Sequence, residues 1–78
     1  MSFQRLDIVR VARLVLEARE VDGVVAEPPR PRPGDVGTVV EELGDDLYLV
    51  ERATDDGRTV WVAEFRGDEL ALVHPAGE

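Results

Sequence analysis

The feature that most restricts the fold of this chain is an Asp56-Gly57 pair between two runs rich in β-branched and aromatic residues. Asp-Gly is the strongest short-range signal for a two-stranded hairpin. The runs on either side, 47–53 and 59–65, have the length of ordinary strands. Alternation in the second run places three residues on one face, namely Trp61, Ala63 and Phe65. The pattern predicts a hairpin that buries this face.

Two further runs extend the predicted β structure. Residues 35–43 are β-branched and end at the turn cluster 44–46, and residues 70–73 form a last short strand. Gly37 lies inside the first of these runs, where glycine usually marks a bulge or a sharp bend. Both faces of the middle strands carry apolar residues. A meander this small hides two apolar faces best by curling into a barrel.

The first third of the chain is open to two interpretations. Residues 6–11 have the pattern of a strand, whereas residues 8–19 also fit an amphipathic helix, although they are rich in β-branched side chains. Asp22-Gly23 stands between valines, which is again a hairpin signature. We therefore favour a long hairpin in which 14–18 pair with 24–27. The proline-rich segment 28–33 then serves as a stiff connector, or alternatively as a ligand for a proline-binding groove.

The segments just described resemble a family of short bacterial proteins known only as a domain of unknown function. The sharpest part of the resemblance is Gly34–Val40, followed by Glu41 and supported by shorter matches in 6–9, 48–51 and 56–58 and at Leu70. More distantly, 34–40 and 60–62 resemble the SH3-like barrel of the nitrile hydratase β subunit. The resemblance implies an all-β fold, a small five-stranded SH3-like barrel, and no assigned activity. Residues 1–78 would form one domain, with 12–33 as an extended first-loop β-hairpin and connector.

Charge separates the chain into two parts. Residues 34–78 carry three arginines and 12 acids, a net charge of -9, whereas residues 1–33 carry six arginines and five acids, a net charge of +1. The total of -8 disfavours nucleic acid and anionic membrane surfaces as partners. The chain shows neither an apolar span nor a signal peptide at its start, so we expect a cytoplasmic location.

The sequence offers little for catalysis. His74 is the only histidine, and no hydroxyl side chain stands in a nucleophile motif. Asp45-Asp46 and Asp55-Asp56 lack calcium-loop spacing, and both stand where turns favour Asp. The chain has no cysteine, hence no thiolate ligand. We expect no enzymatic activity, no cofactor and no metal.

The leading hypothesis is a non-enzymatic acidic module that binds a protein partner, one that carries basic charge. Two hypotheses remain beside it: an accessory barrel for an enzyme of the nitrile hydratase type, and an acidic mimic of nucleic acid. An exposed valine tip would also permit a homodimer. The residues predicted to bind a partner are Asp45, Asp46, Asp55, Asp56, Val21, Val24 and Val25.

Overall fold

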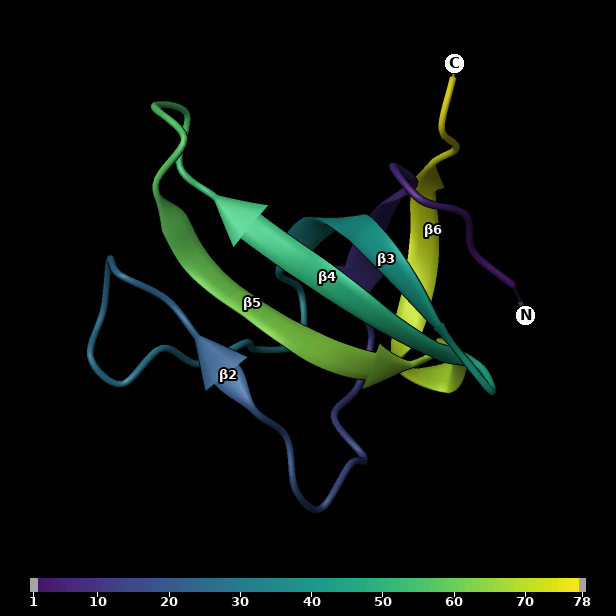
Figure 1. Ribbon diagram of the computed structural model, residues 1–78, viewed down its shortest axis with the longest axis horizontal. Helices are drawn as coiled ribbons and strands as arrows, with labels where there is room; N and C mark the ends of the chain where they lie inside the picture. The colour runs from purple at the N-terminus through teal and green to yellow at the C-terminus, as the bar shows by residue number, and fades with distance from the viewer. Residues whose placement is uncertain (1, 78) are drawn as a thin grey trace.

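The computed structural model describes residues 2–77 and has an all-β fold (Figure 1). Six strands form one antiparallel sheet in the order β2-β5-β4-β3-β1-β6. The strands are β1 (Ile8–Val11), β2 (Val21–Asp22), β3 (Val36–Gly44), β4 (Leu47–Ala53), β5 (Thr59–Arg66) and β6 (Leu70–His74). A short 3-10 helix, η1 (Gly67–Glu69), joins β5 to β6. Within residues 2–77 no helix is long and apolar enough to cross a membrane.

The three central strands follow the sequence pattern closely. β3 and β4 are joined by Asp45 and Asp46, whose φ angles of 50° and 59° place both residues in the left-handed region. Two such residues in succession match the twist of a two-residue hairpin loop. The β4–β5 turn closes when the amide of Gly57 donates to the carbonyl of Thr54, at 2.9 Å. The hairpin predicted at Asp56-Gly57 is therefore confirmed, and residues 44–46 form the turn expected of them.

The core lies on the inner face of the curled sheet. Trp61, Ala63 and Phe65 are almost completely buried, which confirms the face predicted from their alternation. Phe3, which the sequence analysis did not single out, packs edge-on against Tyr48 with ring centroids 5.4 Å apart. The remaining buried hydrophobic residues are Val9, Val11, Val39, Val50 and Leu70.

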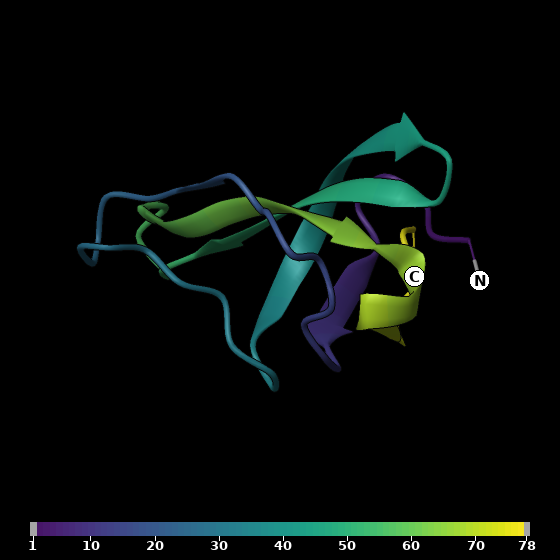
Figure 2. The ribbon, with the colours of Figure 1, turned by 90° about the horizontal axis from the view of Figure 1, so that it is seen from below.

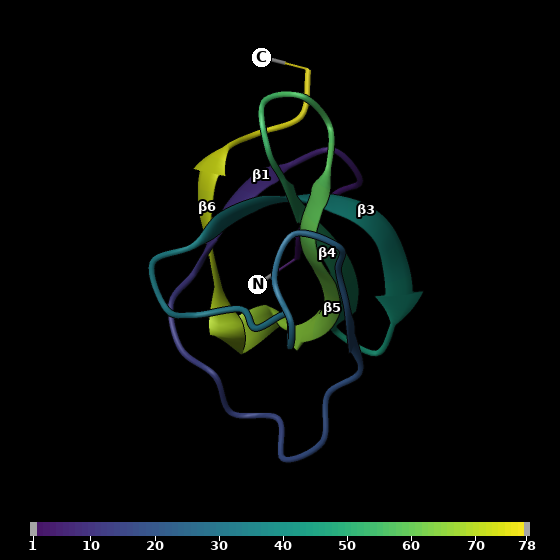
Figure 3. The same cartoon turned by 90° about the vertical axis from the view of Figure 1, so that its left-hand side faces the viewer.

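The prediction of a closed five-stranded barrel is wrong. β2 and β6 form the two edges of the sheet and do not pair with each other. The sheet bends around the core, as Figures 2 and 3 show, and η1 connects its two sides. The long β1–β2 connection is attached to η1 by hydrogen bonds, and these take the place of a strand pairing that would close the sheet. The amide of Ala12 donates to the carbonyl of Glu69, and the amide of Val15 donates to its carboxylate.

The predicted hairpin of 14–18 with 24–27 is also wrong, and so is the helix considered for 8–19. Residues 8–11 form β1, residues 12–20 have no regular structure, and β2 pairs with β5 instead of a neighbouring segment. Gly23 explains the error. Its Cα packs so tightly on the carbonyl of Val60 that a Cβ would overlap it. The glycine permits this close approach and does not form a hairpin turn.

Candidate functional site

The two predicted acidic turns lie at opposite ends of one strand. Asp45 and Asp46 come directly before β4, whereas Asp55 and Asp56 come shortly after it. A strand of seven residues spans roughly 20 Å or more. Figure 1 shows the turns at opposite ends of the sheet. The structure therefore does not join the four carboxylates into one surface.

One aspartate of each turn is used to build the turn. The Tyr48 hydroxyl donates to Oδ1 of Asp46 at 3.4 Å, and the Gly67 amide donates to the Asp46 carbonyl at 2.9 Å. In the other turn, the hydroxyl of Thr54 donates to the carboxylate of Asp56. Asp45 and Asp55 are exposed beside them.

The three valines of the predicted tip do not share an environment. Val21 lies in β2 and packs against the core. Val24 and Val25 are exposed by 69% and 41%. The amide of Val24 donates to the carbonyl of Thr59 at 3.0 Å, which places it near the β4–β5 turn. The structure thus brings Val24 to the end of the molecule that carries Asp55 and separates it from Asp45.

A different acidic surface lies across the strands. We call the side of β2, β5, β4 and β3 that points away from the core the outer face. The register places Leu49 between Glu41 of β3 and Glu64 of β5. Two strand spacings separate these glutamates, about 10 Å. The adjacent row contains Asp22, Val62, Glu51 and Thr38. Sequence reasoning missed this surface. Alternation could have indicated it, because Glu51 follows Val50 and Glu64 follows Ala63, and both of these neighbours are buried.

The carboxylates of the outer face remain available to a partner. Glu51 accepts a hydrogen bond from the Thr59 hydroxyl at 2.6 Å. The ion pairs among residues 2–77 join Arg19 to Glu69 and Arg66 to Asp68, and neither involves a carboxylate of this face. Four acidic side chains, Asp22, Glu41, Glu51 and Glu64, therefore have no ion-pair partner within residues 2–77.

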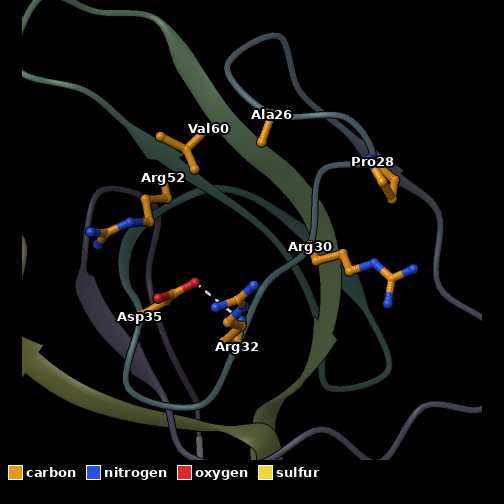
Figure 4. A pocket seen from close by; sticks show the side chains of 7 residues that line it. All are labelled: Ala26, Pro28, Arg30, Arg32, Asp35, Arg52 and Val60. Atoms are coloured by element: carbon orange, nitrogen blue, oxygen red, sulfur yellow. Dashed lines mark hydrogen bonds between the residues drawn. The ribbon is translucent and has the colours of Figure 1, made fainter.

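A pocket of about 270 Å³ forms where the proline-rich connector crosses the sheet (Figure 4). Arg30 and Arg32 line it from the connector, and Arg52 lines it from β4. Pro31, between the first two arginines, is buried and fixes the connector in place. Figure 4 shows the Arg32 side chain between those of Arg30 and Arg52. We call this site the arginine pocket.

The wall of the arginine pocket contains one carboxylate, that of Asp35. Its Oδ2 accepts hydrogen bonds from the indole nitrogen of Trp61 at 3.0 Å and from the amide of Arg32 at 3.1 Å. A guanidinium nitrogen of Arg52 donates to the Val36 carbonyl at 2.9 Å. In the part of the chain that the structure describes, none of the three guanidinium groups has an ion-pair partner.

A buried ion pair holds the long β1–β2 connection. The carboxylate of Glu69 is fully buried and pairs with Arg19, whose guanidinium lies 4.6 Å from the Phe65 ring centroid. Burial raises the pKa of Glu69, but hydrogen bonds from Arg19 and from the amides of Val15 and Arg66 outweigh it, so that the pKa lies below its ordinary value of 4.5. Every contact of this carboxylate shapes the fold, so we assign it a structural role.

Residues 2–77 contain no cluster of three or more His, Asp or Glu side chains that could hold a metal ion. His74 lies exposed at the end of β6, opposite Ile8 of β1. Among the described residues, the charged side chains without ion-pair partners that we consider further are the carboxylates of the outer face and the guanidinium groups of the arginine pocket.

Comparison with known proteins identifies the family. The model of DUF4926, a domain of unknown function, matches residues 6–72. The chain belongs to this family. No curated protein matches it, and no solved structure does either. The match includes the β strands from β1 to the middle of β6. Both surfaces described above thus lie within the DUF4926 domain, while the likeness to the nitrile hydratase β subunit stays a hypothesis.

Proposed function

We propose that this DUF4926 domain is a non-enzymatic binding module that engages a basic protein partner through its outer face. The observation that carries the proposal is the register of β3, β4 and β5, which presents Glu41, Glu51 and Glu64 together without an ion-paired cation among residues 2–77. Half-buried Leu49 and Val62 lie among them. An interface of this kind combines apolar contact with a charged surround.

Electrostatic complementarity acts mainly on the rate of association. A negative face attracts a positive partner over distances of about 10 Å at 0.1 M ionic strength, and added salt screens that attraction. A partner that docks here should therefore bind more slowly and more weakly as the salt concentration rises. The paired strands hold the backbone of these glutamates in fixed register, so that no backbone ordering is needed on binding.

The test compares two variants with the same change in charge. Glu41→Arg/Glu64→Arg reverses two charges of the outer face, and Asp55→Arg/Asp56→Arg reverses two charges of the β4–β5 turn. Partners captured from native cells are identified, purified and measured by surface plasmon resonance at several salt concentrations. We expect a basic partner whose association slows at least tenfold in the first variant and changes much less in the second. Equal losses in both variants, or no loss in the first, would contradict the proposal.

The same row of acids favours a second candidate function. An acidic mimic of nucleic acid presents carboxylates along one face, as Glu41 and Glu64 do on either side of Leu49. Such a module would occupy the nucleic-acid site of its partner. Duplex DNA would then release the captured partner at matched ionic strength, whereas a partner that docks elsewhere would keep the domain bound.

A further inference from the structure

We propose that the arginine pocket is a binding site for a small molecule with a phosphate or carboxylate group. This inference goes beyond the proposed function, because it concerns a different surface and a ligand of opposite charge. Arg52 lies opposite Trp61 in the β4–β5 register and thus on the inner side of the sheet, whereas its neighbour Glu51 lies on the outer face. The two sites are therefore separate.

The first argument is charge. The domain has a net charge of -8, yet three of its nine arginines line one pocket. The lining contains one carboxylate, that of Asp35, so that its net charge is +2. Figure 4 shows the guanidinium groups of Arg30 and Arg52 directed to opposite sides of Arg32. Positive charges around one pocket repel one another, and an anion bound among them would relieve this repulsion. The described part of the chain supplies no such anion within ion-pair distance.

The second argument is the fixed geometry of the pocket. Four prolines flank Arg30 and Arg32 and restrict the backbone on which they stand. Pro29 packs against Gly23, and Gly23 in turn packs against the Val60 carbonyl, which holds the connector on β5. The site is therefore largely formed before a ligand arrives, which reduces the entropic cost of binding.

The third argument concerns which hydrogen-bond donors are left. A guanidinium group has five N–H donors in a planar fork that fits phosphate and carboxylate oxygens. Arg52 uses one of its donors on the Val36 carbonyl. Oδ2 of Asp35 accepts hydrogen bonds from the Trp61 indole and the Arg32 amide. Neither ion pair found among residues 2–77 joins Asp35 to a guanidinium group.

The volume and the apolar wall restrict the ligand further. A volume of about 270 Å³ is near the lower limit for ligand pockets. Ala26, Pro28 and Val60 supply apolar lining, and Figure 4 shows them across the pocket from Arg32 and Asp35. We therefore infer a ligand that has one or two oxyanion groups on a short carbon frame, with the oxyanion against Arg32 and Arg52.

The experiment is an NMR titration of the ¹⁵N-labelled protein with inorganic phosphate, and separately with succinate, at constant ionic strength set by chloride. Trp61 provides a direct readout, because its indole N–H is bound to Asp35 in the pocket wall. We expect saturable shifts of this signal and of the Val60 amide with at least one of the two probes. Saturation with phosphate alone identifies a phosphate ligand, and saturation with succinate alone identifies a carboxylate ligand.

Variants separate the pocket from general charge effects. Arg30→Gln/Arg32→Gln removes two exposed guanidinium groups and leaves the sheet intact, and we expect affinity to fall at least tenfold. Arg52→Gln is expected to do the same. Arg66→Gln removes an arginine at the other end of β5 and serves as the matched control, with affinity unchanged. Shifts that do not saturate with either probe, or that persist in Arg30→Gln/Arg32→Gln, would overturn the proposal.

Discussion

The indole nitrogen of Trp61 donates a hydrogen bond of 3.0 Å to the carboxylate of Asp35, which lies 26 residues earlier in the chain. Trp61 is fully buried, so this bond satisfies a donor that water cannot reach. Asp35 also accepts from the amide of Arg32. A single carboxylate thus connects the core, the start of β3 and the proline-rich connector.

Removal of this acceptor should destabilise the protein. Asp35→Ala leaves the indole donor of Trp61 unsatisfied, which costs about 1–3 kcal/mol in the free energy of unfolding. Asp35→Asn keeps an acceptor and should cost less. Urea denaturation of Asp35→Ala, Trp61→Phe and Trp61→Phe/Asp35→Ala, together with the wild type, completes a double-mutant cycle. A coupling energy near zero between positions 35 and 61 would contradict this role.

The buried pair of Glu69 and Arg19 makes stability dependent on pH. Because the folded pKa of Glu69 lies below 4.5, the unfolded chain takes up its proton first as the pH falls. The ionised Glu69 carboxylate therefore stabilises the fold fully above its unfolded pKa, and this stabilisation is lost as the pH falls through its folded pKa. The free energy of unfolding should therefore drop more steeply below about pH 4.5 in the wild type than in Glu69→Gln.

At neutral pH the same ion pair can be tested by removing the charge of Arg19. Arg19→Met leaves the fully buried Glu69 carboxylate without its cation, at a cost of about 3–5 kcal/mol. Urea denaturation at pH 7 measures this loss. The exposed pair Arg66–Asp68 provides the control, since Arg66→Met should cost below about 1 kcal/mol. Comparable losses in the two variants would show that Glu69 does not depend on Arg19.

Gly37 should not tolerate a side chain. A Cβ at this position would lie 2.7 Å from the carbonyl oxygen of Glu51 and 2.9 Å from a methyl group of Val50. We expect Gly37→Ala to destabilise the sheet by about 1–3 kcal/mol through overpacking. Thr38→Ala, one residue further along β3, serves as the comparison in thermal unfolding. A Gly37→Ala melting temperature equal to that of Thr38→Ala would refute the close contact.

The valines of the predicted tip should differ in their effect on stability. Val21 packs against the core, so Val21→Ala is expected to lower the free energy of unfolding by about 1 kcal/mol. Val24 is 69% exposed, and Val24→Ala should change it by less than about 0.5 kcal/mol. Chemical denaturation distinguishes the two. Equal effects would mean that both side chains share one environment.

The sequence was informative where local rules decide the structure. The Asp56-Gly57 turn and the alternation around Trp61 concern residues close together in the chain, and both predictions are confirmed. Gly37 lies where β3 approaches the Glu51 carbonyl closely, but the register shifts of β3 lie further along the strand, between Val39 and Gly44. The bulge expected at Gly37 is therefore not at that residue.

The features that the sequence did not predict depend on contacts between residues far apart in the chain. Asp22-Gly23 has the local signature of a hairpin, yet Val21 and Asp22 pair with β5, about 40 residues later. The residues next to Glu69 in the sequence do not indicate that its carboxylate forms an ion pair with Arg19 and accepts a hydrogen bond from the Val15 amide. The arginine pocket escaped prediction likewise, because Arg52 meets Arg30 and Arg32 only after the connector folds across the sheet.

The buried carboxylate of Asp7 holds both terminal segments, since its two oxygens accept hydrogen bonds from the amides of Gln4 and Ala76, at 2.8 and 2.7 Å. Residues 4 and 76 are therefore spatial neighbours. A short peptide linker should be able to connect them, and the chain could then be reopened in the β3–β4 turn as a circular permutant.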